Sequence, residues 1–321
     1  MSSTRSKNIL QLIEDEYIIK ILRCCINNRE CDLTKNIQEH RQSFIKKIIN
    51  HYRLVNLSTR FNLVKKITEN VVEALSSLGF QTLIIDARLR TQALFGASQG
   101  VLESVFEVGM SWDYILDLPL IPSSSVKGAV RGTLEQLLRS EYDIPRTNKE
   151  CNNCLEYVNI LFGTGGHEGW TGLLLFFDAY PLTIKNSSGR LLEPDIISPH
   201  YMHGTEVVRF ERLVEPVPVP HVSIAPGVVF RFIVAAKPTE EVEEALNGLM
   251  RCFGKNAKTS LRSKIASLLA TVFRYGIGAR TSRGYGKFEV DRMEIRIGEN
   301  TSHTPIFLES TTQPLRKEKG T

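Results

Sequence analysis

The sequence predicts an α+β fold built on a four-stranded antiparallel sheet, and three observations support this class. Apolar residues recur every three or four positions from residue 5 to about residue 78, the spacing of amphipathic helices. Beyond Gly79, several segments alternate apolar and polar residues, as strands do. Their order is strand, helix, strand, strand, helix, strand, which is that of the split βαβ or ferredoxin-like unit. In that unit both helices cover one face of the sheet. We expect the other face to be a free platform for single-stranded RNA, as in RRM-like domains.

Residues 1–79 are predicted to form a helical N-terminal extension. Gly79 follows the last apolar repeat, where a glycine commonly ends a helix. Between Lys35 and Lys66 the chain holds eight Lys and Arg residues and a single acid, Glu39. This basic run fits either a solvated helix face or a face that contacts phosphates, and the sequence leaves both interpretations open.

Residues 80–298 are predicted to form the ferredoxin-like core, followed by a flexible tail at 299–321. The first strand begins after Gly79 and places Asp86, Arg88 and Arg90 on the free face. The first helix is SSSVKGAVRGTLEQLLRS, which starts with serines of the type that cap helices. A proline-rich stretch at 180–226 is predicted to be an insertion with hairpin-like pieces. The other predicted elements are strands at 171–179, 228–235 and 285–297 and a helix at 259–275.

Charge is concentrated rather than large in total. The chain has 321 residues and a net charge of +5, yet the block 251–287 contains nine basic residues and no acid. The remainder therefore carries −4, and a concentrated basic block indicates a polyanionic partner.

The composition also excludes some classes of protein. Six cysteines follow no disulfide-framework spacing, and the polar N-terminus is unlike a signal peptide, so we expect reduced thiols and a cytoplasmic protein. No apolar run approaches the roughly 20 residues of a membrane-spanning helix.

A glycine-rich segment, YGIGARTSRGYGKFEV, joins the last predicted helix to the last strand. Its glycines let a backbone approach a partner closely, and we expect exposed amides and basic side chains to contact phosphates. A glycine-rich turn with incidental arginines is the alternative. The glycines are Gly276, Gly278, Gly284 and Gly286, and the basic residues are Arg280, Arg283 and Lys287.

The serine-rich helix start is a second candidate anion site. Ser124 and Ser125 offer hydroxyls and amides at the positive end of the helix dipole. Lys127 and Arg131 lie four residues apart and share a face. A plain serine cap with both cations in solvent explains the pattern equally well.

Metal and nucleotide sites are not expected. Cys151 and Cys154 with His200 and His203 have ligand-like spacing within each pair, but the gap between the pairs is far longer than in a zinc finger. The segment GTGGHEGWTG lacks the Lys-Ser/Thr end of a P-loop. There is no G-x-S-x-G elbow of a serine hydrolase. We therefore predict no metal and no other cofactor.

Three segments together resemble the RAMP superfamily of CRISPR-associated RNA-binding proteins. They are the glycine-rich loop, IPSSSVKGAVRGTL and LFGTGGHEGWTGLLLFFDAYP. FFDAYPL followed by LEPDIISPHY is similar in particular to the sixth-subunit family of type III-B (Cmr) effector complexes. The resemblance covers Thr82 to about Arg296.

The resemblance implies a non-catalytic backbone or capping subunit that holds guide RNA (crRNA) at its 3′ end in antiviral defence. The implied protein partners are the repeated backbone subunit, the small helical subunit and the other terminal RAMP subunit, with target RNA as an indirect partner. The implied RNA contacts are Ser124, Ser125, Lys127, Arg131 and the loop from Gly276 to Lys287, to which the strand pattern adds Arg88 and Arg90.

No catalytic residue is carried over from the family. Target-RNA cleavage is attributed there to an aspartate of the neighbouring repeated subunit, and nothing in the sequence assigns that role to Asp113 or Asp117. One alternative is a metal-independent RAMP endoribonuclease that processes CRISPR repeat RNA with a His or Tyr near the loop. Tyr275 and Tyr285 are close in sequence, but no histidine lies between His221 and His303. A purely structural adaptor is the other alternative.

Overall fold

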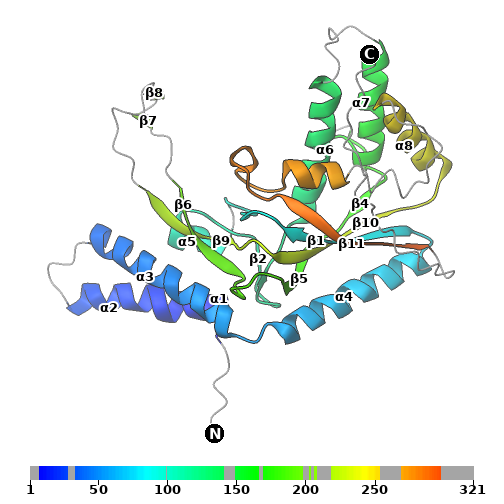
Figure 1. Cartoon of the computed structure of the whole chain (residues 1–321). Coiled ribbons are helices and arrows are strands. Elements are labelled where there is room, and N and C mark those ends of the chain that lie inside the picture. Colours follow the sequence, from blue (N-terminus) through cyan, green and yellow to red (C-terminus); the bar gives the residue numbers. More distant parts are fainter. Residues whose placement is uncertain are drawn as a thin grey trace.

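The computed structural model describes residues 7–27, 33–98, 100–140, 149–165, 169–197, 202–203, 206–207, 218–253 and 269–297. Figure 1 shows a central sheet with helices on both sides and a helical arm at one end. The helices are α1 (Ile9–Ile13), the π-helical turn η1 (Glu14–Ile18), α2 (Ile19–Asn27), α3 (Leu33–Leu54), α4 (Ser58–Ser77), α5 (Val101–Phe106), α6 (Ser123–Ser140), α7 (Lys149–Phe162), α8 (Glu240–Cys252), a helix at 269–275 and the 3₁₀ turn η3 (Thr281–Arg283). The strands are β1 (Gln81–Leu89), β2 (Trp112–Asp113), β3 (Leu118–Pro119), β4 (Leu175–Phe176), β5 (Tyr180–Ile184), β6 (Leu192–Ile197), β7 (Met202–His203), β8 (Glu206–Val207), β9 (Val219–Ile224), β10 (Val228–Ala236) and β11 (Phe288–Ile297).

The main sheet is antiparallel throughout and has β1 at its centre. Its strand order is β11-β1-β10-β4, and β5 pairs with β10 beyond β4 along the same edge. The α+β class and the antiparallel sheet predicted from the sequence are therefore confirmed, but the sheet has five strands in the described residues rather than the four expected, because β5 adds to the edge of β10. Of the strand expected at 171–179, only β4 forms, and Ala179 makes a bridge to Ile121 ahead of α6. The next strand, β5, lies at the start of the predicted insertion.

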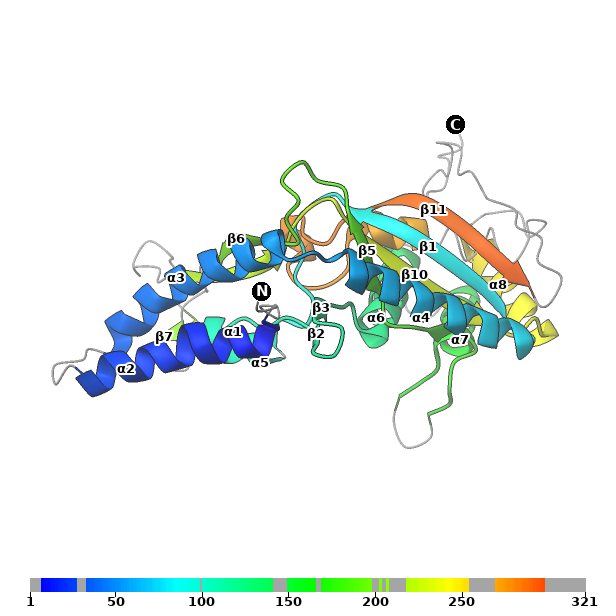
Figure 2. The ribbon, with the colours of Figure 1, turned by 90° about the horizontal axis from the view of Figure 1, so that it is seen from below.

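Both faces of this sheet are covered, which corrects the expectation of a free face. On one face, alternate residues of β1 such as Leu83 and Ile85 join the main hydrophobic core together with α6. On the other face, Ile84 and Ile233 pack against Val72 and Leu75 of α4. Figure 2 shows α4 lying along the sheet on the side away from α6 and α7. The N-terminal segment thus occupies much of the surface that a bare ferredoxin-like sheet would leave open.

A buried ion pair lies beneath α4. The guanidinium of Arg231 on β10 donates to both carboxylate oxygens of Asp86 on β1, at 2.8 and 2.9 Å. Its third nitrogen lies 3.4 Å from the hydroxyl of Thr68 on α4. Burial acts to lower the pKa of Arg231, but the Asp86 carboxylate outweighs it and raises the pKa. Asp86 was expected in solvent, whereas it pairs with a cation because α4 excludes water from it.

The N-terminal helices partly follow the prediction of continuous helix. The chain turns at 55–57, between α3 and α4, and residues 28–32 lie outside the described part. Gly79 has a φ of +78°, and the Phe80 amide donates to the carbonyl of Leu75 at 2.9 Å, so the predicted glycine stop is confirmed.

Helices α7 and α8 are elements that the sequence reading missed. For α8 the signal was present, because Thr239 caps the helix, acidic residues fill its first turn and Val242, Leu246 and Leu249 recur on one buried face. A disulfide joins Cys154 of α7 to Cys252 of α8. The expectation of reduced thiols is therefore wrong for this pair, and Cys154 is unavailable as a thiolate ligand for the imagined zinc site.

None of the described helices is long and apolar enough to cross a membrane.

The buried ion pair yields a stability prediction. Arg231→Met leaves the Asp86 carboxylate buried without its partner and should lower the free energy of unfolding by about 3–5 kcal/mol in urea denaturation. Arg292→Met removes an exposed partner of Glu294 and should cost about 1 kcal/mol or less. Equal losses in the two variants would contradict the role of the buried pair.

The disulfide yields a second prediction. Its cysteines are 98 residues apart, so Cys154→Ser should lower stability by about 2–4 kcal/mol in non-reducing buffer and have little further effect after reduction. Cys151→Ser should be nearly silent in both buffers. Thermal unfolding with and without dithiothreitol measures both effects. A metal that is bound to the wild-type protein and absent from the Cys151→Ser variant would revive the zinc hypothesis.

Candidate nucleic-acid interface

The glycine-rich loop, residues 276–287, is closed onto the chain itself. The amides of Ala279 and Gly286 donate to the carbonyls of Leu94 and Gln92, each at 2.9 Å. The Ile277 amide donates to the carbonyl of Gly286 at 3.0 Å. Most of the loop amides expected to face phosphates therefore donate to the protein itself, either within the loop or to neighbouring segments such as the one that follows β1.

Close backbone approach explains two of the glycines. Gly278 and Gly286 have φ values of +99° and +67°, a region that favours glycine. A Cβ atom on Gly286 would collide with the carbonyl oxygen of Ile277, and one on Gly278 would collide with that of Leu94. The predicted close approach is thus real, but the partner is the protein's own backbone.

The three basic residues of the loop fall into two groups. The guanidinium of Arg280 stacks over the ring of Tyr285, with its carbon 4.6 Å from the ring centre, and lies 3.6 Å from the Asp195 carboxylate. Arg283 and Lys287 are exposed and have no acidic partner among the described residues. Arg280 therefore helps to hold the loop, whereas Arg283 and Lys287 remain available to a polyanion.

Asp195 on β6 is the centre of a polar cluster beneath the loop. It accepts hydrogen bonds from the Tyr285 hydroxyl at 3.0 and 2.9 Å, and the Nε2 atom of His221 lies 3.2 Å away. Burial acts to raise the pKa of Asp195, but the contacts with His221 and Tyr285 outweigh it, so the pKa lies below its usual value. Burial, reinforced by the Asp195 carboxylate, raises the pKa of Tyr285.

The same cluster places a histidine beside the loop, which the sequence reading did not find. His221 pairs with Asp195 across the β6–β9 ladder and is wholly buried. Only the fold reveals this neighbour, because His221 is far from the loop in sequence.

The serine-rich start of α6 also differs from its expected role. The Ser123 amide donates to the carboxylate of Asp178 at 2.6 Å, so the protein's own acid occupies part of the expected anion site. Ser124 is exposed, while the Ser125 amide donates to the Pro122 carbonyl at 2.9 Å. Lys127 is half-buried and has no acidic partner in the described part of the chain.

Arg131, unlike Lys127, is engaged in hydrogen bonds within the protein. Its guanidinium donates to Glu135 at 2.7 Å, to the side chain of Asn159 at 2.8 Å and to the carbonyl of Gly163 at 2.5 Å. These contacts bind α6 to the end of α7, so the charge of Arg131 serves the packing of the two helices.

Arg88 and Arg90 are likewise engaged with acids. Both donate to Oε2 of Glu289 on β11, at 2.7 and 2.8 Å, and Arg88 lies 3.5 Å from Asp291. The hydrogen bond from Arg90 is the largest cause lowering the pKa of Glu289; burial opposes it, and Arg88 adds to the lowering. The positive charge expected from Arg88 and Arg90 on the free face of the sheet is therefore largely neutralised by acidic residues.

The two aspartates considered for RNA cleavage, Asp113 and Asp117, are both engaged in contacts that hold the fold. Asp113 accepts the amides of Ile115 and Leu116, both at 2.9 Å, and the Tyr180 hydroxyl at 3.0 Å. Asp117 is buried and accepts three hydrogen bonds in addition to an ion pair with Arg60.

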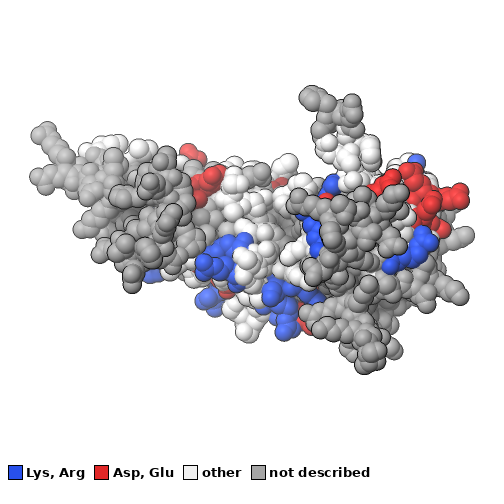
Figure 3. All heavy atoms as spheres, turned by 90° about the horizontal axis from the view of Figure 1, so that it is seen from above, with Lys and Arg blue, Asp and Glu red and all other residues white. Residues whose placement is uncertain are grey.

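Charge is unevenly spread over the visible face. In Figure 3, Lys and Arg side chains gather in the middle of the molecule, while Asp and Glu side chains gather toward the right end.

Some of the predicted residues lie outside the described part of the chain. These are four residues of the basic block, Lys255, Lys258, Arg262 and Lys264, and His200 of the considered zinc set. The described residues contain no group of three His, Cys, Asp or Glu side chains placed to hold a metal.

The cluster around Asp195 yields a prediction about loop rigidity. A hydrogen bond to a charged group contributes about 1.5–3 kcal/mol, so Asp195→Asn should speed amide exchange of Ala279 and Gly286 about tenfold or more. Asp178→Asn, which alters a carboxylate at the α6 start, is the matched control. Unchanged exchange in the Asp195 variant would show that the cluster does not hold the loop.

Comparisons with protein families, with known sequences and with solved structures each find proteins similar to this chain. A family model described as the RAMP superfamily matches residues 86–289. The CRISPR system CMR subunit Cmr6 of Saccharolobus solfataricus is 31% identical over 262 residues, which cover 82% of this chain and 76% of that protein. Cmr6 of Pyrococcus furiosus is 23% identical over 273 residues, covering 71% and 73%. A chain in the cryo-EM structure of the type III-B Cmr-beta bound to cognate target RNA superimposes with a TM-score of 0.58 and 27% identity, over 88% of this chain and 82% of that chain.

Proposed function

The chain belongs to the RAMP superfamily, within the Cmr6 family, and from this premise we propose that it is a non-catalytic RNA-binding subunit of a type III-B CRISPR effector complex. Membership confirms the resemblance drawn from the sequence motifs. The structural match is to a chain of a Cmr assembly bound to target RNA, which supports a role within such a complex. The finer role is that of a capping subunit that holds the guide RNA near its 3′ end.

The observation that carries the proposal is the set of cations without acidic partners. Arg283, Lys287 and Lys127 are exposed or half-buried and unpaired in the described part of the chain, whereas Arg280, Arg131, Arg88 and Arg90 are engaged. Phosphate contacts from side chains fix RNA without reading its sequence, so the guide bases stay free to pair with a target. We keep Ser124, with its exposed hydroxyl, among the RNA contacts.

The domain division follows the same proposal. We assign residues 80–298 to the ferredoxin-like RAMP domain, with the insertion at 180–226, and the strand order β11-β1-β10-β4 supports it. We assign residues 1–79 to the helical extension. Ile18 at the end of η1 and Leu22 and Ile26 on α2 recur at four-residue spacing. All three are exposed, Ile26 by 79%, which suits a protein neighbour. The proposed neighbours are other Cmr subunits, above all the repeated backbone subunit, in the cytoplasm.

A nuclease remains the second candidate because His221 and Tyr285 lie together beside the loop. These are residue types that cut RNA without metal, but both side chains are buried, Tyr285 at 8% exposure and His221 at 0%. Their contacts with Asp195 suit loop support better than acid–base chemistry.

Incubation of the purified protein with labelled repeat RNA in EDTA tests the proposal. We expect binding that weakens with salt and no cleavage by the isolated chain. Cleavage abolished by a single His or Tyr substitution would establish the nuclease instead, and absence of binding at low salt would leave only the structural adaptor.

A charge-removal experiment tests the loop contacts. If Arg283 and Lys287 each neutralise one phosphate, Arg283→Ala with Lys287→Ala should flatten the slope of log affinity against log salt by roughly 1.4, at about 0.7 for each phosphate. Lys65→Ala with Lys66→Ala, exposed on α4, is the control of equal charge and should leave the slope nearly unchanged. Equal slopes for the wild type and the loop variant would refute the contacts.

A further inference from the structure

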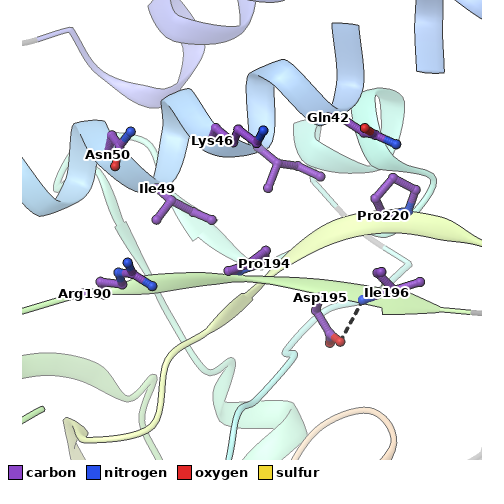
Figure 4. A pocket seen from close by; sticks show the side chains of 10 residues that line it. Gln42, Lys46, Ile49, Asn50, Arg190, Pro194, Asp195, Ile196 and Pro220 are labelled. Atoms are coloured by element: carbon purple, nitrogen blue, oxygen red, sulfur yellow. Dashed lines mark hydrogen bonds between the residues drawn. The ribbon is translucent and has the colours of Figure 1, made fainter. Parts of the chain in front are cut away.

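A pocket of about 520 Å³ lies between α3 and the β6–β9 hairpin, on the helical arm. Figure 4 shows α3 forming one wall and β6 with β9 forming the other. Ile45 and Ile49 of α3 and Pro194, Ile196 and Pro220 of the hairpin give it an apolar floor. Its volume is that of a site for a small organic group, which usually combines apolar walls with a few polar atoms.

The polar residues at this pocket are cations and amides. Lys46 is exposed on the α3 wall, and Arg190 lies on the opposite wall just before β6. Neither forms an ion pair with an acid among the described residues, although the charge of Arg190 acts on the carboxyl group of Glu193. The Nε atom of Arg190 is buried without a hydrogen bond among the described residues. Gln42 and Asn50 add two exposed side-chain amides to the α3 wall.

The single carboxylate of the lining does not cancel this charge. Side chains alternate along β6, so Pro194 and Ile196 face α3 while Asp195 points away from it, as Figure 4 shows. The carboxylate of Asp195 is engaged with Tyr285, His221 and Arg280 beneath the glycine-rich loop. The pocket and the loop therefore lie on opposite faces of one hairpin, and the pocket keeps a net positive lining.

Lys46 differs from its basic neighbours in sequence because several of them form ion pairs with acidic residues. Lys47 donates to Glu16 at 2.6 Å, Arg41 pairs with Glu107 at 2.8 Å, and Arg60 pairs with Asp117 at 2.8 Å. These cations hold the helices in place. Three cations of the basic run are thus engaged within the fold, and Lys46 at the pocket is a member that remains available for a ligand.

We propose that this pocket binds one nucleotide of a single-stranded RNA, with the base on the isoleucine and proline floor and a phosphate between Lys46 and Arg190. Apolar side chains suit an unstacked base, and side-chain amides such as that of Gln42 or Asn50 hydrogen-bond base edges. An acidic peptide would use the two cations but has less need of the apolar lining and the amides. The inference rests on the proposed RNA-binding function and extends the RNA path from the loop to the helical arm.

The test uses the full chain and a labelled single-stranded repeat RNA. Lys46→Gln with Arg190→Gln should weaken binding at least fivefold at 0.1 M salt and flatten the salt slope by roughly 0.7, as expected for one phosphate. Gln42→Ala with Asn50→Ala should weaken binding without changing the slope, because these side chains are uncharged. Lys65→Gln with Lys66→Gln is the control of equal charge, and circular dichroism verifies that each variant is folded.

Photocrosslinking locates the contact independently of affinity. RNA carrying 4-thiouridine should crosslink to peptides containing residues 42–50 or 190–196 in the wild type and lose that crosslink in the Lys46/Arg190 variant. Wild-type binding with no such crosslink and an unchanged slope in the variant would overturn the pocket while leaving the proposed function intact. Absence of wild-type binding would instead overturn the proposed function. Loss of polyglutamate binding but not RNA binding in the variant would assign the pocket to an acidic peptide and refute the nucleotide.

Discussion

The arrangement of the N-terminal helices depends on the buried carboxylate of Asp117. This group accepts the Ile9 amide at the start of α1 at 3.0 Å, the Tyr52 hydroxyl of α3 at 2.7 Å and the indole of Trp112 in β2 at 3.1 Å. Arg60 of α4 lies 2.8 Å from it and balances its charge. A buried carboxylate is costly unless it is fully paired, so these four contacts must form together, and they set three helices against the β2–β3 turn. Burial raises the pKa of Tyr52, with Asp117 adding to the effect, so the phenol stays a donor.

Two surfaces follow from this placement. Because Arg60 lies in the first turn of α4, the Asp117 contacts direct α4 along the sheet, where it covers Ile84 and the Arg231–Asp86 pair. Because Tyr52 lies near the end of α3, the same contacts set α3 beside the β6–β9 hairpin and create the pocket. In the proposed function, the RNA therefore lies along the loop and the arm rather than across a free sheet face.

The glycine-rich loop gains its shape from contacts within the chain. Its amides bind the segment after β1, and Tyr285 and Arg280 anchor it to Asp195. A loop held in this way loses little conformational freedom when a partner binds, which favours affinity from few contacts. Only the cations that the anchoring does not use, such as Arg283 and Lys287, are left to meet a polyanion.

The sequence alone determined many of the local elements and the family. Ser123 starts α6 as predicted, Gly79 ends α4, and the alternation after it forms β1. These features depend on caps, glycine conformations and periodicity, which act over a few residues. The tertiary structure alone decided that α4 covers the sheet, that Cys154 bonds Cys252, that His221 lies beside the loop and which arginines are already paired. The Arg231–Asp86 pair joins residues 145 apart, and no local pattern reports how distant charges pair or which sheet face another segment will bury.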